Sequence, residues 1–111
     1  MPDKKEMEEK MSQLQLLEQN MQALVTQKQQ FQSQLNEIES ALEELGKSQE
    51  SYKMVGNIMV KSDKKDLEED LKKKKEVAEL RIKTIEKQEA SLKEKAQKTQ
   101  TEVLGNIKEK E

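Results

Sequence analysis

The sequence predicts a mainly α-helical fold in which two long antiparallel helices form a coiled coil and one central β-hairpin joins them. Three observations support this prediction: the composition, an apolar heptad repeat in the first half, and a β-rich stretch at mid-chain. The 111 residues are 40% charged and 2% aromatic, with 32% hydrophobic. These apolar side chains are too few for a compact globule, whereas a coiled coil needs only a narrow apolar stripe.

The first half of the chain follows one heptad frame. Ten of its twelve seam positions are apolar, which favours a coiled-coil helix because a repeat of 3.5 residues keeps one seam facing a partner. The seam positions are Met7, Leu14, Met21, Lys28, Leu35 and Leu42, and then Lys10, Leu17, Leu24, Phe31, Ile38 and Leu45. We predict a helix over residues 3–46 that ends with Gly46 as a left-handed C-cap.

A β-hairpin is predicted over residues 52–61, where β-branched and aromatic residues surround a Gly-Asn pair. Gly56 suits the first central position of a type II′ turn, which would pair Val55 with Ile58 and Met54 with Met59. Both faces of this ribbon are then apolar, so the hairpin predicts assembly through strand addition or barrel closure. The assembly residues are Tyr52, Met54, Val55, Gly56, Ile58, Met59 and Val60.

A second helix is predicted over residues 63–107, capped by Ser62 or Asp63. Its apolar stripe is thinner and is interrupted at Lys74 or Lys75 and at Glu89, which predicts looser packing along this helix. The stripe consists of Leu67, Leu71, Ala78, Ile82, Ile85, Leu92, Ala96, Thr99 and Val103.

The predicted turn at Gly56-Asn57 lies at the middle of the chain, with helical segments of about equal length on either side. This symmetry predicts an antiparallel pair of helices within a single domain, residues 1–111. Some 45 residues per helix would give an arm of roughly 65 to 70 Å, with both chain termini at its free end. We call that free end the tip.

Composition excludes most catalytic chemistry. Cysteine and histidine are both absent, which removes disulfides, thiol nucleophiles, imidazole bases and nearly all zinc or copper ligand sets. We therefore predict no catalytic residues, no metal and no cofactor. A net charge of −2 offers no general attraction for nucleic acid, and no apolar run approaches the roughly 18 residues of a membrane span. A soluble, cytoplasmic protein that binds neither nucleic acid nor membrane is expected.

The order of these elements resembles archaeal prefoldin β subunits over nearly the whole chain. The resemblance lies in the Gln- and Leu-rich first helix with its Leu-Glu-Glu-Leu ending, the hairpin Tyr52-Lys53-Met54-Val55-Gly56-Asn57-Ile58-Met59-Val60-Lys61, and the second-helix segment Glu79-Leu80-Arg81-Ile82-Lys83-Thr84-Ile85-Glu86-Lys87-Gln88-Glu89. The hairpin is the most specific part. The resemblance implies an ATP-independent chaperone with two α-class and four β-class subunits, whose hairpins form a double β-barrel. It also implies that unfolded clients are held at the tips and passed to a group II chaperonin.

The family's client-binding region corresponds to apolar residues near the two chain ends. These residues are Met7, Met11, Val103, Leu104 and Ile107. Methionine is flexible and polarizable, so it can contact varied apolar segments. The alternative is that these side chains are only the last layers of the coil.

Two other functions are compatible with parts of the sequence. The run Lys72-Lys73-Lys74-Lys75 suggests a nucleic-acid-binding helical arm, but Glu68, Glu69 and Asp70 stand four residues before three of these lysines, which favours ion pairs within the helix. A structural coiled-coil scaffold would explain the heptads equally well but leaves the hairpin unexplained.

Overall fold

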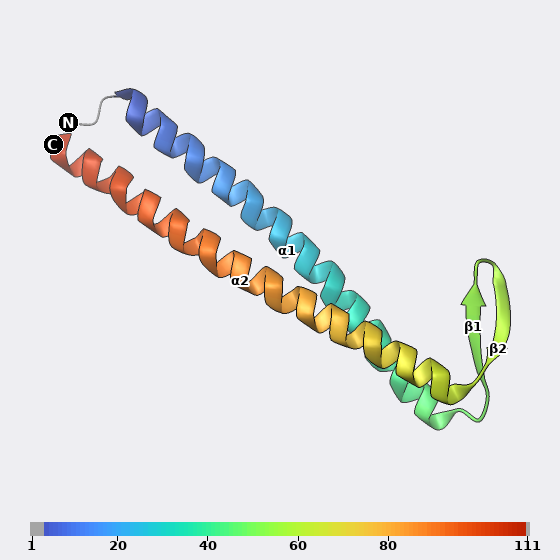
Figure 1. Ribbon diagram of the computed structural model, residues 1–111. Coiled ribbons are helices and arrows are strands. Elements are labelled where there is room, and N and C mark those ends of the chain that lie inside the picture. The colour runs from blue at the N-terminus through green and yellow to red at the C-terminus, as the bar shows by residue number, and fades with distance from the viewer. Residues whose placement is uncertain (1–3, 111) are drawn as a thin grey trace. The chain divides into compact units, whose positions relative to one another are not determined.

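The computed structural model describes residues 4–110, with side chains for residues 4–105. The chain folds as helix α1 (Lys4–Lys47), strands β1 (Ser51–Val55) and β2 (Ile58–Ser62), and helix α2 (Lys64–Lys110), as Figure 1 shows. The predicted fold class of two long helices around one central hairpin is confirmed. The ends of the elements differ from the predicted ones by one to three residues.

The chain divides into two compact units, each of which contains a segment of both helices. One unit comprises residues 1–28 and 84–111, and the other comprises residues 29–83, which include the hairpin. In the first unit, Lys10 and Lys28 of α1 form ion pairs with Glu102 and Glu89 of α2. Residues far apart in the sequence are therefore neighbours across an antiparallel helix pair.

The hairpin has the predicted register. Strands β1 and β2 are antiparallel, with Val55 opposite Ile58 and Met54 opposite Met59, and the pairing extends to Ser51 opposite Ser62. Gly56 has a φ of 61°, and no other residue in the described part of the chain has a positive φ. A positive φ at the first central position alone is the signature of a type II′ turn, whose twist matches that of the flanking strands.

The end of α1 differs from the prediction. Gly46 is not a left-handed cap, because its φ is negative and the helix continues through Lys47. Instead, Ser48 satisfies the last turn: its Oγ donates a hydrogen bond to the carbonyl of Glu44 at 3.0 Å, and its N–H donates to the carbonyl of Leu45 at 3.4 Å. A hydroxyl side chain that bonds a carbonyl four residues back offers the chain a way to leave the helix without a left-handed residue.

Gly46 and Gly56 form a matched pair for testing this difference. Neither glycine has an atom within 4 Å of an added Cβ, so backbone conformation decides the effect of alanine. We expect Gly46→Ala to raise the free energy of unfolding by about 0.5–1 kcal/mol, because alanine favours helix. Gly56→Ala should lower it by about 1–2 kcal/mol, because the left-handed conformation strains an L-residue. Chemical denaturation measures both changes in the free energy of unfolding. A loss of stability in Gly46→Ala would support the left-handed cap.

Helix α2 begins with the predicted N-cap. Asp63 is the capping residue rather than Ser62: its Oδ1 accepts a hydrogen bond from the Lys65 N–H at 3.2 Å, and its carbonyl accepts one from the Leu67 N–H at 3.0 Å. Ser62 instead ends strand β2. The cap satisfies backbone donors that the first helical turn leaves without partners.

The most buried apolar side chains among the described residues all lie on α2. Ala78, Ile82, Ile85 and Val103 are the buried apolar residues among those described, whereas α1 has none. The prediction of looser packing along the second helix is therefore wrong at these positions. The apolar seam residues of α1 are half-buried.

Candidate functional site

The hairpin exposes apolar side chains on both of its faces. Six apolar residues of β1 and β2 have exposed fractions between 45% (Val60) and 67% (Ile58). Alternation along paired strands places Val55, Ile58 and Val60 on one face, and Tyr52, Met54 and Met59 on the other. The predicted assembly residues are thus brought together on one ribbon. A two-stranded ribbon with this much exposed apolar surface is marginal by itself in water.

Hydrogen bonds at the base of the hairpin hold it in position. Ser51 is buried, and its Oγ donates to the carbonyl of Ser62 at 2.7 Å, while Lys64 Nζ donates to the carbonyl of Ser48 at 3.0 Å. The Tyr52 hydroxyl donates to Glu50 Oε2 at 2.8 Å. This hydrogen bond, with a smaller contribution from desolvation, raises the pKa of Tyr52 above its ordinary value of 10.0.

The predicted client-binding residues have different surroundings. Met11 and Leu104 are each 53% exposed, and the ion pair between Lys10 and Glu102, at 3.4 Å, places them at the same end of the helix pair. Met7 is half-buried and Val103 is buried, so Val103 is a layer of the coil. The side chain of Ile107 lies outside the described residues.

Charged residues in the helix seams form ion pairs across the coil. Lys28 Nζ lies 3.3 Å from Glu89 Oε1, and Lys75 Nζ lies 3.9 Å from Glu39 Oε1. Lys75 and Glu89 are the residues that interrupt the apolar stripe of α2, so each interruption has a partner of opposite charge on α1. The heptad pattern alone did not predict these pairs. For Lys28 and Glu89 the available signal was a charge of opposite sign at a seam break of each helix, whereas Glu39 lies outside the seam of α1.

The Lys28–Glu89 pair is the most shielded of these interactions. The side chains of Lys28 and Glu89 are 28% and 20% exposed. In the ion pair within α2, the side chains of Lys72 and Glu68 are 62% and 45% exposed. Glu89 Oε1 is fully buried and accepts no hydrogen bond from any described residue. Lys28 Nζ, at 3.3 Å from this oxygen, forms an ion pair with it but not a hydrogen bond. Lys28 therefore supplies charge compensation alone.

The four consecutive lysines of α2 are largely engaged with carboxylates. Lys72 pairs with Glu68 at 3.0 Å, Lys74 with Asp70 at 3.8 Å, and Lys75 with Glu39 across the coil. This arrangement neutralises much of the positive charge that a phosphate backbone would require. It argues against a nucleic-acid-binding arm.

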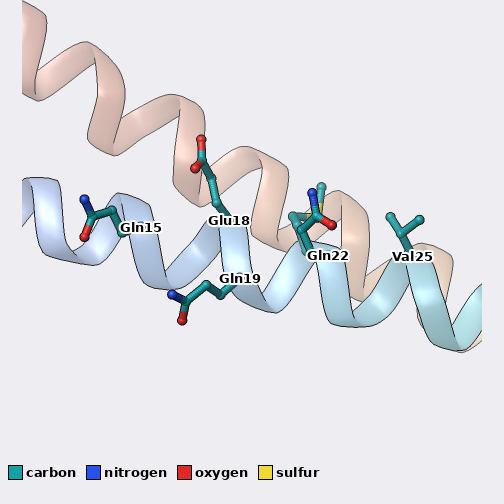
Figure 2. A pocket seen from close by; sticks show the side chains of 6 residues that line it. Gln15, Glu18, Gln19, Gln22 and Val25 are labelled. Carbon is teal, nitrogen blue, oxygen red and sulfur yellow. The ribbon is translucent and has the colours of Figure 1, made fainter.

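An open groove of mixed polar and apolar lining lies along the first half of α1. Its lining is dominated by glutamine, and Figure 2 shows these side chains projecting from the helix; the residues are Gln15, Glu18, Gln19, Met21, Gln22 and Val25. Amide groups of this kind are hydrated in an open groove, and they carry no nucleophile or general base. Within residues 4–110, no group of side chains has the composition of a metal site, and neither helix contains an apolar stretch able to span a lipid bilayer.

Comparison with known proteins identifies the family. The prefoldin subunit family matches residues 8–109, which is almost the whole chain. The chain belongs to the prefoldin subunit family. Among curated relatives, the prefoldin β subunit of Archaeoglobus fulgidus is 47% identical over 92 residues, which cover 80% of this chain and 79% of the relative. The prefoldin β subunit of Methanothrix thermoacetophila is 38% identical over 105 residues, which cover 92% of this chain and 88% of the relative.

The three-dimensional comparison gives the same class. The crystal structure of the prefoldin β subunit from Thermococcus strain KS-1 superimposes with a TM-score of 0.85 at 32% identity, covering 90% of both chains. The predicted resemblance to the β class of archaeal prefoldins is therefore confirmed. Prefoldin is a family of chaperones rather than of enzymes, in agreement with a site made of exposed apolar surface.

Proposed function

We propose that this chain is a subunit of a hexameric prefoldin that holds unfolded polypeptides without ATP and delivers them to a group II chaperonin. The proposed hexamer contains two α-class and four β-class subunits, with the hairpins joined in an inter-subunit β-barrel. The observation that supports it most is the ribbon of exposed apolar residues within a prefoldin β fold. Barrel closure would pair both edges of this ribbon with neighbouring strands and bury its inward face.

Exposed apolar area at the hairpin is sufficient to favour assembly. Complete burial of a Val, Ile or Met side chain contributes about 1.5–3 kcal/mol. The hairpin side chains would gain only part of this, because part of their surface is already covered in the single chain. The half-exposed side chains of the face that points into the barrel therefore offer a few kcal/mol for each hairpin that enters it. The two strand edges add backbone hydrogen bonds with neighbouring hairpins.

Client binding is proposed at the tip, with Met11 and Leu104 as the principal contacts. Both side chains are exposed in the folded coil, and each residue stands within two positions of the Lys10–Glu102 ion pair along its own helix. Val103 is buried, so it supports the tip by packing. A single exposed pair binds weakly, but several arms that hold one client gain affinity through their high effective concentration.

The double substitution Met11→Ser/Leu104→Ser tests this assignment. We expect hexamers that carry it to suppress aggregation of a chemically unfolded client several-fold less well than the wild type, without added nucleotide. The physical reason is that hydroxymethyl groups offer little apolar area to the client. Because both residues are exposed, thermal stability and hexamer size should change little.

Leu16→Ser is the matched control, since Leu16 is 58% exposed on α1 but is not one of the proposed tip contacts. Its hexamers should protect the client as the wild type does. Full protection by the Met11→Ser/Leu104→Ser hexamers would rule out these tip contacts. Equal loss in the control would mean that apolar surface anywhere on the arm holds the client.

A further inference from the structure

The apolar layers of the coil do not by themselves define one register. Leu14, Met21 and Leu35 recur at one seam position of α1, one or two heptads apart, and have similar size and helical preference. A shift of α1 by one heptad along α2 would replace one such residue with another. The transfer of apolar surface out of water would change little, because this contribution is non-directional and depends on area.

The charged seam positions distinguish one register from the next. Lys28 faces Glu89 at 3.3 Å. One heptad along α2 in either direction stand Ile82 and Ala96, and one heptad along α1 stand Met21 and Leu35. A shifted register would therefore place both the ammonium and the carboxylate against apolar side chains. Isolated charges in such surroundings are strongly disfavoured.

We propose that Lys28 and Glu89 form a register pair, which restricts α1 to one alignment with the α2 of its own chain. The burial of Glu89 Oε1 without a hydrogen bond makes the site intolerant of a wrong neighbour. The second ion pair of the same unit, between Lys10 and Glu102, opposes a shift in one direction only. A shift of one heptad toward Lys95 would bring Lys10 to a charge of the same sign, whereas the opposite shift would bring it toward Glu109.

The register pair also disfavours pairing between two copies of α1. In a parallel pair of such helices, a seam residue faces its own counterpart, so Lys28 would meet Lys28 and Lys10 would meet Lys10. Like charges in a seam oppose association. The intramolecular antiparallel partner is then the one that supplies a carboxylate to each lysine.

The register can be measured as a distance between two spin labels in the full-length chain. Native cysteines are absent, so Ser12→Cys and Lys87→Cys provide the two label sites, and both residues are exposed. The two ion pairs place Ser12 near the level of Glu102, and Lys87 near the level of Lys28. The labels are therefore offset along the helices, and a slip of one heptad, about 10 Å, lengthens or shortens their separation.

We expect a single distance in the wild type, and in the charge-reversed variant Lys28→Glu/Glu89→Lys. The apolar variant Lys28→Met/Glu89→Leu should show a second distance, because both registers then offer an apolar layer. Leu24→Ala is the control, since it removes volume from the seam but leaves the charges in place. It should lower the melting temperature and keep one distance. A mixture of the two singly labelled chains detects pairing between copies.

Two results would overturn the proposal. One distance in Lys28→Met/Glu89→Leu, with none between chains, would show that the connection through β1 and β2 determines the register alone. A second distance in Leu24→Ala would show that register follows overall stability, because this variant retains both charges.

Discussion

Replacing Val55 and Ile58 with aspartate is expected to abolish the hexamer while most helical content remains. These two residues face each other across the turn of the hairpin on the same face of the ribbon, and both are exposed in the single chain. Aspartate in water at these positions disturbs little in the isolated subunit. In an assembled barrel, the same two carboxylates would be taken out of water next to each other, without a compensating charge.

The measurement is sedimentation of the variant mixed with an α-class partner, together with circular dichroism of the variant alone. The matched control is Leu16→Asp/Val77→Asp, which introduces two carboxylates at exposed apolar residues of the helices. The control should form full-sized hexamers. If Val55→Asp/Ile58→Asp also formed them, the hairpin would not be the assembly surface.

The second large effect is expected on stability. Lys28→Met should lower the free energy of unfolding by about 2–3 kcal/mol, because the buried oxygen of Glu89 loses its compensating charge and has no hydrogen bond to replace it. Adding Glu89→Leu to this variant should restore stability to the wild-type level or above it. Replacement of a shielded ion pair by apolar side chains of similar size is often neutral or stabilising.

Chemical denaturation of the four chains in a double-mutant cycle gives the coupling between the two sites. Lys72→Met is the control, because its ion pair with Glu68 is exposed and lies within one helix. It should change stability by no more than about 0.5 kcal/mol. An equally small loss of stability in Lys28→Met would mean that water or a rearrangement compensates the charge of Glu89. A strongly destabilised Lys28→Met/Glu89→Leu chain would mean that packing, rather than charge, accounts for the contribution of these two residues.

Local sequence pattern was sufficient for the elements of this protein. The heptad repeat predicts α1, and the Gly-Asn pair between β-branched residues predicts the hairpin together with its register. Asp63 is one of two predicted caps for α2, and it is the residue observed. These features depend on residues within a few positions of one another, so steric limits on φ and ψ and the periods of helix and strand determine them. The exposure of both hairpin faces follows from the same alternation.

The candidate tip could be predicted only in part. Position near the chain ends suggested five apolar residues, but whether each faces the partner helix or water depends on rotation about the helix axis. The structure separates buried Val103 from exposed Leu104, its neighbour in sequence. A difference of one residue turns a side chain by about 100° around a helix, and this is enough to exchange a packing role for an exposed one.

Pairing between the helices was decided by tertiary structure alone. The end of α1, by contrast, is a local feature: Gly46 predicted a left-handed cap, yet the helix runs one residue further and Ser48 bonds the carbonyls of its last turn. Glu89 was predicted to interrupt the stripe of α2, and it does so opposite a lysine that interrupts the seam of α1. Sequence by itself determines which residues are charged and how far apart they stand along one helix. Which charge meets which across the coil depends on the alignment of two helices, because an ion pair forms only where the two chain segments lie within a few ångströms of each other.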